Sequence, residues 1–291
     1  MGQHTGTDGR HDTAIPGLTL YRFSHPTDPA YVLQEPAVYV VAQGRKQVAL
    51  GQDVYVYDRT NYLVVSVDLP VVGNVFEASP ERPYLCLTLA VDPHELAMLM
   101  AETGRRGPED RLDGRGLYLN PITPPLLEGL VRLVRLLDAK DDIPVMAPLV
   151  LREVNYRLLQ GDEGGRLAQI AIGDGRARRV ADAIAWIKHH YTEPLQIEEL
   201  ARQVHMSASS LHHHFRTVTA MSPVQYQKRL RLQEARRLML TGALSTESVA
   251  DQVGYASASQ FSREYARLFG DPPRKDARRI RESAHRAARV A

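Results

Sequence analysis

The sequence predicts an α+β protein in which an antiparallel β-domain with trailing helices precedes an all-α domain. Three observations carry this prediction. Residues 31–91 consist of short apolar or alternating runs separated by Gly, Asp, Asn and Pro. Helical periodicity replaces this pattern from Pro93, and a pattern of short helix, tight turn and second helix occurs twice beyond Arg176.

Length and charge favour two domains of different character. The 291 residues suffice for two independent cores, and their composition is that of an ordinary globular protein. Residues 1–175 contain 16 Lys and Arg against 23 Asp and Glu, whereas residues 176–291 contain 20 against 11. A basic C-terminal module suits a polyanionic partner, although a solvated basic surface also explains the charge taken alone.

No segment suggests a membrane-spanning or secreted protein. The chain has no run of about 18 apolar residues that could span a bilayer, and its N-terminus lacks the apolar stretch of a secretory signal. A single cysteine, Cys86, rules out an intramolecular disulfide and cannot supply the paired thiolates of a structural zinc site. We therefore expect a cytoplasmic protein without a membrane partner.

The β-rich region predicts a cupin-like jelly roll. Short strands with turn residues between them suggest an antiparallel sandwich or small barrel, whose interior can hold a ligand. We expect this domain to cover residues 21–165 and to follow a disordered polar tail over residues 1–20. The strand-like runs are 36–44, 45–51, 52–58, 61–70, 71–80 and 82–91.

Helices are expected after the strands. Asp92 is placed to cap a helix that begins at Pro93. Apolar residues at helical spacing predict a second helix between residues 123 and 140, and a third covers about 148–159. These two helices either cover an open face of the β-domain or form a dimer seam. The Gly-rich, charged residues 166–178 predict a linker.

Residues 179–280 predict a helical domain with two helix-turn-helix units, followed by a tail over residues 281–291. A small residue, Ala201 in one unit and Ala250 in the other, lets the two helices of each unit cross closely. The turn between them needs glycine or a tolerant residue. Equivalent anchors such as Leu211 and Phe261 lie 50 residues apart.

A long helix is expected between the two units. Ser222, Pro223 and Gln225 form a capping-box start, and the helix ends at Gly242. This helix sets the distance between the second helices of the units. At a distance of about 34 Å, both second helices could enter successive major-groove segments of one duplex.

The second helix of each unit is the predicted DNA reader. Arg263 is the best candidate for reading a base, because its planar guanidinium matches the O6 and N7 acceptors of guanine. His212 and His213 can donate to base edges or phosphate, and Arg216, Lys228 and Arg229 are expected to contact phosphate. The solvent-facing positions are Ser209, His212, His213 and Arg216 in the first unit and Ala258, Ser259, Ser262 and Arg263 in the second.

The run VADQVGYASASQFSREYARLFGDPP and the shorter run RLQEAR also carry a resemblance. With them, residues 180–279 resemble the DNA-binding domain of the AraC/XylS family of transcription regulators. The sequence departs from the family pattern at Ala220, where glycine is usual, at Asp276, where an aromatic is common, and at residues 212–214, where an arginine is usual. The further matching positions are Leu200, Ala201, Met206, Ser207, Leu211, Phe215, Ser222, Pro223 and Tyr226.

Residues 35–85 resemble the N-terminal domain of one AraC-type subgroup, so the similarity extends over nearly the whole chain. The resemblance implies a regulator of transcription, most commonly an activator, that binds double-stranded DNA, contacts RNA polymerase and responds to a small-molecule effector. We also expect a homodimer that pairs through the helices at 122–160. Polar handles for the effector are Tyr39, Tyr62, Ser66, Glu77 and Cys86, although each is also explained by ordinary packing or surface exposure.

Two alternative functions would each need a chemically reactive site, namely a metal-dependent enzyme and an alkyl-transfer repair sensor. A metal-dependent cupin-type enzyme with an accessory DNA-binding domain would need clustered His and carboxylate ligands, but no histidine occurs between His25 and His94. Consecutive histidines at 212–214 point about 100° apart on a helix and cannot converge on one ion. An alkyl-transfer repair sensor would need a reactive thiol, and Cys86 has no adjacent cation. We therefore expect no catalysis, metal or cofactor.

Overall fold

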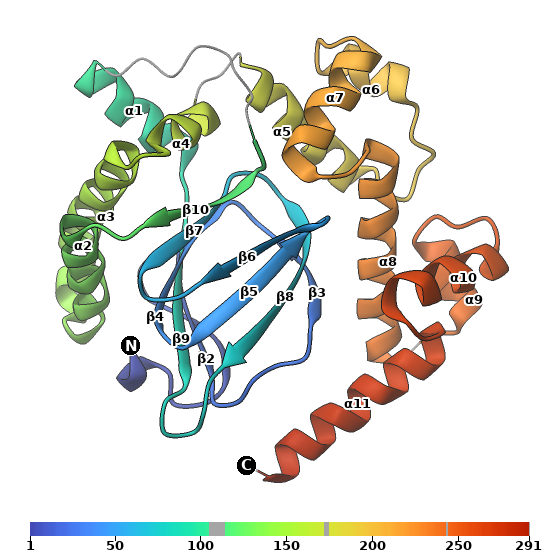
Figure 1. Cartoon of the computed structure of the whole chain (residues 1–291), viewed down its shortest axis with the longest axis horizontal. Coiled ribbons are helices and arrows are strands. Elements are labelled where there is room, and N and C mark those ends of the chain that lie inside the picture. The colour runs from blue at the N-terminus through green and yellow to red at the C-terminus, as the bar shows by residue number, and fades with distance from the viewer. Residues whose placement is uncertain (105–113, 172–174, 243, 291) are drawn as a thin grey trace. The chain divides into compact units, whose positions relative to one another are not determined.

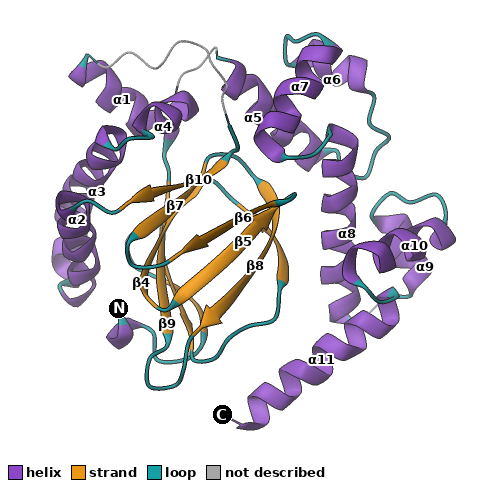
Figure 2. Cartoon of the chain, viewed as in Figure 1, coloured by secondary structure: helices purple, strands orange, loops and turns teal. Residues whose placement is uncertain are grey.

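The chain divides into two compact units. The computed structural model describes residues 1–104, 114–171, 175–242 and 244–290. Contacts between backbone positions group Met1–Asp182 with Ser209–Met221, and Ala183–Ala208 with Ser222–Ala291. The described strands all lie in the first unit, and the second is helical (Figure 2).

Two antiparallel sheets form the β-domain of the first unit (Figure 1). The larger sheet has the order β1-β2-β9-β4-β7-β10, and the smaller has the order β3-β8-β5-β6. This confirms the predicted antiparallel β-domain. Strands β4, β5, β6, β7 and β9 each fall within one predicted run, whereas β8 spans the end of the run 61–70 and most of the run 71–80. The bounds are β1 Gly9–Asp12, β2 Leu18–Phe23, β3 Ala30–Gln34, β4 Ala37–Gln43, β5 Arg45–Leu50, β6 Asp53–Tyr57, β7 Asn61–Val65, β8 Leu69–Glu77, β9 Tyr84–Ala90 and β10 Leu117–Pro121.

The two faces of the larger sheet differ in character, because successive side chains of a strand point to opposite faces. On β9, Leu87 and Leu89 belong to the hydrophobic cluster that includes the helices. Cys86 and Thr88, which alternate with them, line a cavity that is also lined by residues of the smaller sheet. The apolar face of this sheet is therefore its helix-covered face, and the more polar face looks into the cavity.

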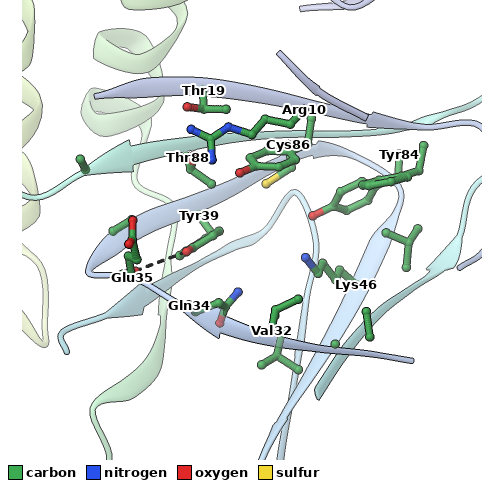
Figure 3. A pocket seen from close by; sticks show the side chains of 18 of the residues that line it. Arg10, Thr19, Val32, Gln34, Glu35, Tyr39, Lys46, Tyr84, Cys86 and Thr88 are labelled. Carbon is green, nitrogen blue, oxygen red and sulfur yellow. Dashed lines mark hydrogen bonds between the residues drawn. The ribbon is translucent and has the colours of Figure 1, made fainter. Parts of the chain in front are cut away.

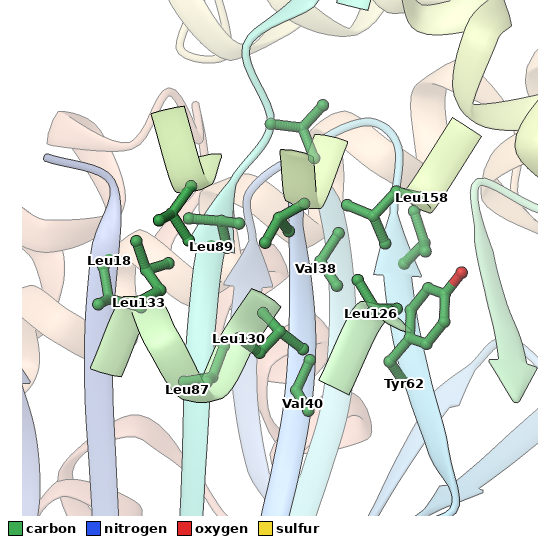
Figure 4. Close-up of a cluster of buried hydrophobic side chains, with 14 of the residues drawn as sticks. Leu18, Val38, Val40, Tyr62, Leu87, Leu89, Leu126, Leu130, Leu133 and Leu158 are labelled. Carbon is green, nitrogen blue, oxygen red and sulfur yellow. The ribbon is translucent and has the colours of Figure 1, made fainter. Parts of the chain in front are cut away.

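Helices cover the apolar face of the larger sheet (Figure 4). Leu126, Leu130 and Leu133 of α2 and Leu158 of α3 pack in one buried cluster with residues of β2, β4, β7 and β9 such as Val38. Each fully buried side chain of this size contributes about 1.5–3 kcal/mol to folding. The bounds are α1 Pro93–Thr103, α2 Pro124–Arg135, α3 Ile143–Gln160 and α4 Gly164–Ala171, with 3-10 turns at Gly2–His4, Leu136–Asp138 and Lys140–Asp142.

The start of α1 follows the prediction. Asp92 adopts an extended conformation and its carboxylate accepts a hydrogen bond from the backbone N–H of His94 at 2.8 Å. Pro93 occupies the first turn, where its missing N–H costs nothing. Of the two roles considered for the helices after α1, covering the β-domain is the one that the buried cluster shows.

The expected disordered tail over residues 1–20 is wrong. Residues of this segment form β1 and the start of β2, and β2 pairs with β9 from Leu18↔Leu89 to Phe23↔Tyr84. Ile15 and Leu18 are 1% and 2% exposed. Apolar residues alternate with polar ones here over too short a stretch to stand out, and pairing with β9, a strand distant in the chain, decides their structure.

Three other boundaries shift toward more helix than the sequence predicted. The expected linker 166–178 overlaps α4 and the first turn of α5, and Leu167 of α4 is buried in the cluster beneath α1 and α3. Helix α3 begins at Ile143 and contains Pro148, where the prediction had placed a helix start. The final helix continues to Val290, through the residues expected to form a tail.

The remaining helices form a repeat. Each repeat is a helix-turn-helix unit of two helices. The first helix of the unit is α6, from Ile197, or α9, from Thr246, and the second is α7, from Ala208, or α10, from Ala258. The turn of the second unit therefore holds one residue more than the turn of the first. The bounds are α5 Arg176–His189, α6 Ile197–Gln203, α7 Ala208–Thr219, α8 Pro223–Thr241, α9 Thr246–Gln252, α10 Ala258–Phe269 and α11 Pro273–Val290.

The predicted long helix α8 has both expected ends. The Ser222 hydroxyl accepts a hydrogen bond from the Gln225 N–H at 3.2 Å, and the Gln225 side chain accepts one from the Ser222 N–H at 2.9 Å. This is the predicted capping box. Gly242 ends the helix in a left-handed conformation with φ 74°.

Candidate DNA-reading helices and effector cavity

The two helix-turn-helix turns share one backbone hydrogen bond. After α6, the Met206 N–H donates to the Ala201 carbonyl at 2.9 Å, and after α9 the Tyr255 N–H donates to the Ala250 carbonyl at 2.9 Å. Ala201 and Ala250 are both buried, as expected for the small residues of the predicted crossings. The repeat predicted from the sequence is therefore also a repeat of hydrogen bonds.

The two helix-turn-helix units also use the left-handed backbone region at equivalent positions, once in the turn and once directly after the second helix. Among the described residues, only two non-glycine residues have positive φ, His205 at 53° and Ala220 at 62°. Glycine occupies the equivalent places in the second unit, Gly254 at 84° and Gly270 at 86°. The left-handed region costs a residue with a Cβ roughly 1–2 kcal/mol, so the first unit folds with a backbone penalty that the second avoids.

Helix α7 presents the predicted face to solvent. Ser209, His212, His213 and Arg216 are exposed, at spacings of three, one and three residues, which place them on one helix face. Phe215, between them in sequence, is fully buried. All four residues predicted from the first unit are therefore accessible to a partner.

Helix α10 presents the equivalent face with different chemistry. Ser259 and Arg263 are exposed, and Ala258 and Ser262 are half-buried. Arg263 forms no ion pair within the part of the chain that the structure describes, so its guanidinium is available. Sequence reasoning missed Arg267, which is also exposed and lies one helical turn after Arg263. Its spacing of four from Arg263 could have indicated it.

A polar network fixes α10 to α8. The Glu264 carboxylate accepts hydrogen bonds from Lys228 at 2.9 Å, from the Tyr255 hydroxyl at 2.8 Å and from Gln260 at 3.2 Å. Burial opposes ionisation of Glu264, but these hydrogen bonds outweigh it and hold the pKa of the carboxyl below its usual range. Lys228, expected to contact phosphate, is exposed and also ties α8 to α10 through Glu264.

Arg231 of α8 anchors the second turn. Its guanidinium donates to the backbone carbonyls of Tyr191 at 2.6 Å, Gly254 at 2.8 Å and Glu193 at 2.9 Å. Burial lowers the pKa of Arg231. Three neutral carbonyls satisfy the donors of this cation, which ties the loop after α5 to the turn before α10.

The departure at Asp276 creates a buried charge centre. Asp276 is 0% exposed and accepts two hydrogen bonds from Arg236, at 2.8 and 2.9 Å. The Tyr265 hydroxyl donates at 2.9 Å and Arg279 at 2.7 Å. Burial alone would raise the pKa of Asp276, but the bonds from Arg236 and Tyr265 lower it. An acidic residue replaces the expected aromatic because two arginines and a tyrosine surround it.

A cavity of about 810 Å³ lies between the two sheets of the β-domain (Figure 3). Its size lies within the range of small-molecule sites. The polar and aromatic side chains lining it come from both sheets and include Tyr21, Gln34, Tyr39, Lys46, Tyr84 and Cys86.

The five predicted effector residues do not lie together. Tyr39 and Cys86 line the cavity. Tyr62 points to the other face of the sheet, where its hydroxyl accepts a hydrogen bond from Asn120 at 3.1 Å, and it lines a separate pocket of about 240 Å³. Ser66 donates to the Gly116 carbonyl, and Glu77 is exposed beside Arg45. The last three residues are therefore outside the large cavity.

Lys46, Tyr84 and Gln34 line the cavity and were missed. Strand β5 held a usable signal, because Lys46 alternates with Val48 and Leu50, which are both 0% exposed. A lysine on the inward face of a strand is unusual enough to mark a site.

Cys86 behaves as an ordinary buried thiol, since burial raises its pKa and keeps it protonated, which argues against the alkyl-transfer alternative.

In the described ranges, no group of three or more His, Cys, Asp or Glu side chains is arranged to hold a metal ion. None of the helices in the described part of the chain is long and apolar enough to cross a membrane.

Comparison with known families identifies both halves of the chain. The family described as AraC-type transcriptional regulator N-terminus matches residues 14–166, more than half of the chain. The chain belongs to the AraC/XylS family of transcriptional regulators. A helix-turn-helix domain family matches residues 200–279 of this regulator. The N-terminal family is one of transcriptional regulators, so it does not support the metal-dependent enzyme.

Individual relatives of the regulator are similar over parts of their length. It is 32% identical over 137 residues to the HTH-type transcriptional activator RhaS of Escherichia fergusonii, covering 47% of this chain and 45% of that one. It is 26% identical over 180 residues to the thermoregulatory protein LcrF of Yersinia pestis, covering 62% and 65%. The regulator thus spans between about half and two thirds of the length of these curated relatives.

A solved structure shares the fold of the regulator. The unsaturated fatty acid bound form of ToxT from Vibrio cholerae aligns with a TM-score of 0.57 over 89% of this chain and 94% of that one, at 13% identity. At this identity the similarity shows the fold alone. It agrees with the β-domain and the helical region described above.

Proposed function

We propose that the regulator is a sequence-specific DNA-binding activator of transcription that reads duplex DNA with α7 and α10 under the control of a small-molecule effector. The observation that carries the proposal is the equivalence of the two exposed faces. Ser209, His212 and His213 of α7 occupy the same places in their helix as Ser259, Ser262 and Arg263 occupy in α10, so both reading helices offer the same positions.

The two helices are proposed to read DNA with different groups. The free guanidinium of Arg263 can donate two hydrogen bonds to one guanine, which discriminates against other bases by about 1–3 kcal/mol. His212 and His213 offer single ring donors to base edges or phosphate, and Arg216 offers charge to the backbone. We infer that α10 supplies the stricter base preference and α7 the weaker one.

The cavity between the sheets is proposed as the effector site. Its size suits a small molecule, and Tyr39 and Cys86, from the predicted set, line it. ToxT, a protein of this fold, has been crystallised with an unsaturated fatty acid bound. Effector binding is proposed to change how strongly the regulator binds DNA.

A homodimer is proposed to form through α2 and α3. These two helices pack against each other and carry apolar side chains that face solvent. The exposed fractions are 47% for Leu127, 38% for Val131, 67% for Val145, 42% for Met146 and 58% for Leu149. In sedimentation at micromolar concentration, Leu149→Glu should convert dimer to monomer, whereas Val54→Glu, at a 60% exposed valine of β6, should not.

Contact with RNA polymerase follows from the activator role, which the name of the RhaS relative supports. Transcription reconstituted from a promoter that carries the selected site tests this role. Increased transcript on addition of the regulator supports activation, and decreased transcript from the same template would make it a repressor.

The first test is selection of genomic duplex fragments by the purified full chain at about 150 mM salt, where nonspecific phosphate attraction is weak. We expect a site of about 20 base pairs with two sequence blocks one helical turn apart. Uniform recovery of fragments, with and without candidate effectors, would overturn the proposal.

A further inference from the structure

Lys46 brings a positive charge into the effector cavity. It lies on β5 between Tyr57 of β6 and Val75 of β8, and its side chain points into the space between the sheets (Figure 3). Its neighbours on the same face of β5 are Val48 and Leu50, both 0% exposed. The strand thus places an ammonium group where its pattern otherwise places core residues.

No carboxylate of the described residues neutralises Lys46, which takes part in none of their ion pairs. The acidic residues that line the cavity, Asp12, Asp28 and Glu35, are all exposed at its rim. Asp12 is also bound by Arg10 at 2.9 Å. Burial lowers the pKa of Lys46, as expected for a cation held away from water without a counter-charge.

The surroundings of Lys46 offer further polar groups and room. The Tyr84 hydroxyl on the facing sheet and Gln34 Oε1 are buried and have no hydrogen-bond partner among the described residues. Gly73, across from β5, has no side chain, and a Cβ there would stand 3.6 Å from Lys46 Cε. Tyr21 and Tyr39 add aromatic surface to the wall.

We propose that the effector is a small organic carboxylate, whose carboxylate pairs with the Lys46 ammonium and whose apolar or aromatic body lies against Tyr21 and Tyr39. A half-buried cation without a counter-charge is costly, and a carboxylate ligand removes this cost while it satisfies the Tyr84 hydroxyl. A neutral ligand of the same shape would leave Lys46 unpaired. The inference rests on the proposed role of the cavity as the effector site.

Matched pairs of ligands test the carboxylate requirement. Binding of benzoate and benzamide, 4-phenylbutanoate and 4-phenylbutanamide, and octanoate and octanamide to the full chain is measured by calorimetry. A charge-assisted hydrogen bond contributes about 1.5–3 kcal/mol, so at least one acid should bind about 10-fold to 100-fold more tightly than its amide. Failure of every acid to exceed its amide, or to bind at all, overturns the inference.

Variants separate Lys46 from general charge effects. Lys46→Met keeps the apolar stem and should reduce the acid preference to about 3-fold or less, while amide affinity stays unchanged. Tyr84→Phe should cause a smaller loss, and Lys140→Met, at an exposed lysine, should cause none. A Lys46→Met variant that keeps the full preference would contradict the proposal.

DNA binding distinguishes failure of this inference from failure of the proposed function. The same protein samples are tested on the selected DNA site. If DNA binding is specific and responds to amides as strongly as to acids, the proposed function as a regulator is supported and the carboxylate inference is wrong. If no ligand changes specific DNA binding, the effector role of the cavity itself fails.

Discussion

The two helix-turn-helix units of this regulator solve one backbone problem with different residues. Both need a left-handed residue after the first helix and another after the second, and the first unit uses His205 and Ala220 where the second uses Gly254 and Gly270. In the second unit, Arg231 donates to the Gly254 carbonyl and Tyr255 donates to Glu264. The comparison teaches that equal geometry does not mean equal stability, because the first unit carries backbone strain that the second does not.

The third helices of the repeat extend the comparison. Tyr226 of α8 and Asp276 of α11 occupy equivalent positions, in the first turn of helices that both begin with proline, and both are 0% exposed. An aromatic ring fills the first position, whereas a carboxylate with two arginine partners fills the second. Charge pairing thus stabilises the second unit at the position where burial of an aromatic ring stabilises the first.

The largest expected effect comes from removing this buried charge. Asp276→Asn leaves Arg236 buried without its counter-charge and should destabilise the helical unit by about 3–5 kcal/mol. Urea unfolding followed by fluorescence of Trp186, the single tryptophan, measures this loss. Asp251→Asn, at an exposed carboxylate of α9, is the control and should change stability little.

The same variant has a defined pH dependence. Folding lowers the pKa of Asp276, so its ionised form stabilises the fold above the unfolded value of about 3.9, and this contribution disappears as pH falls through the lower folded pKa. The stability difference between wild type and Asp276→Asn should therefore shrink in acid. A difference that stayed constant from neutral pH to about pH 2 would refute the charge-pairing account.

A Cβ at Gly254 should have the next largest effect. It would lie 2.2 Å from the Thr192 carbonyl oxygen, in addition to the cost of the left-handed backbone, so Gly254→Ala should destabilise by about 2–4 kcal/mol. Gly270→Ala has the same backbone cost but meets nothing within 4 Å, and should cost only about 1 kcal/mol. Equal losses in Trp186-monitored unfolding would show that the close contact with Thr192 is unimportant.

Paired substitutions at His213 and Arg263 compare the two reading helices. Arg263→Ala should weaken DNA binding by about 1–3 kcal/mol and relax the preference for guanine at one position. His213→Ala should have a smaller effect and leave that preference intact. Quantitative binding to the selected site and to single-base variants measures both, with exposed Arg59→Ala in the β-domain as a control for lost charge. A larger loss of DNA affinity from His213→Ala than from Arg263→Ala would contradict the proposal that α10 supplies the stricter base preference.

The smallest expected effect is an increase in stability. Ala220→Gly restores the glycine usual in the family at a residue with φ 62°, and should stabilise the fold by about 1 kcal/mol at most, because glycine also gains entropy in the unfolded chain. A shift of the urea midpoint to higher concentration is expected. If Ala220→Gly destabilised the protein, the first unit would carry no strain at this position.

Sequence patterns predicted much of this architecture because their signals are local. The alternating runs located β4 to β9, Asp92 and Ser222 marked two helix starts, and the repeat placed the four exposed residues of α7 correctly. The missed strands β1, β2, β3 and β10 are short, and β1, β3 and β10 lie at the sheet edges. Their pairing partners, rather than their own composition, give them strand structure.

The lining of the cavity between the sheets was predicted less well than the exposed faces of α7 and α10, for a physical reason. On a helix of a known repeat, exposure follows from spacing, whereas a strand offers two faces and only its neighbours decide which face is which. Tyr62 and Cys86 both lie in apolar strands, yet one faces the helices and the other faces the cavity. Alternation in the sequence assigns the residues of a strand to two opposite faces, but it does not show which face contacts the helices and which faces the cavity.

The sequence alone determined the family, the two-part organisation and the positions that face solvent on α7, whereas on α10 only Ser259 and Arg263 of the four predicted positions are exposed. These follow from local periodicity, helix caps and the internal repeat. The tertiary structure decided that the apolar face of the larger sheet lies beneath α1 to α4, that Lys46 enters the cavity and that Asp276 has arginine partners. Those outcomes depend on segments distant in the chain, and burial of apolar surface by packing between such segments fixes which side chains remain for chemistry.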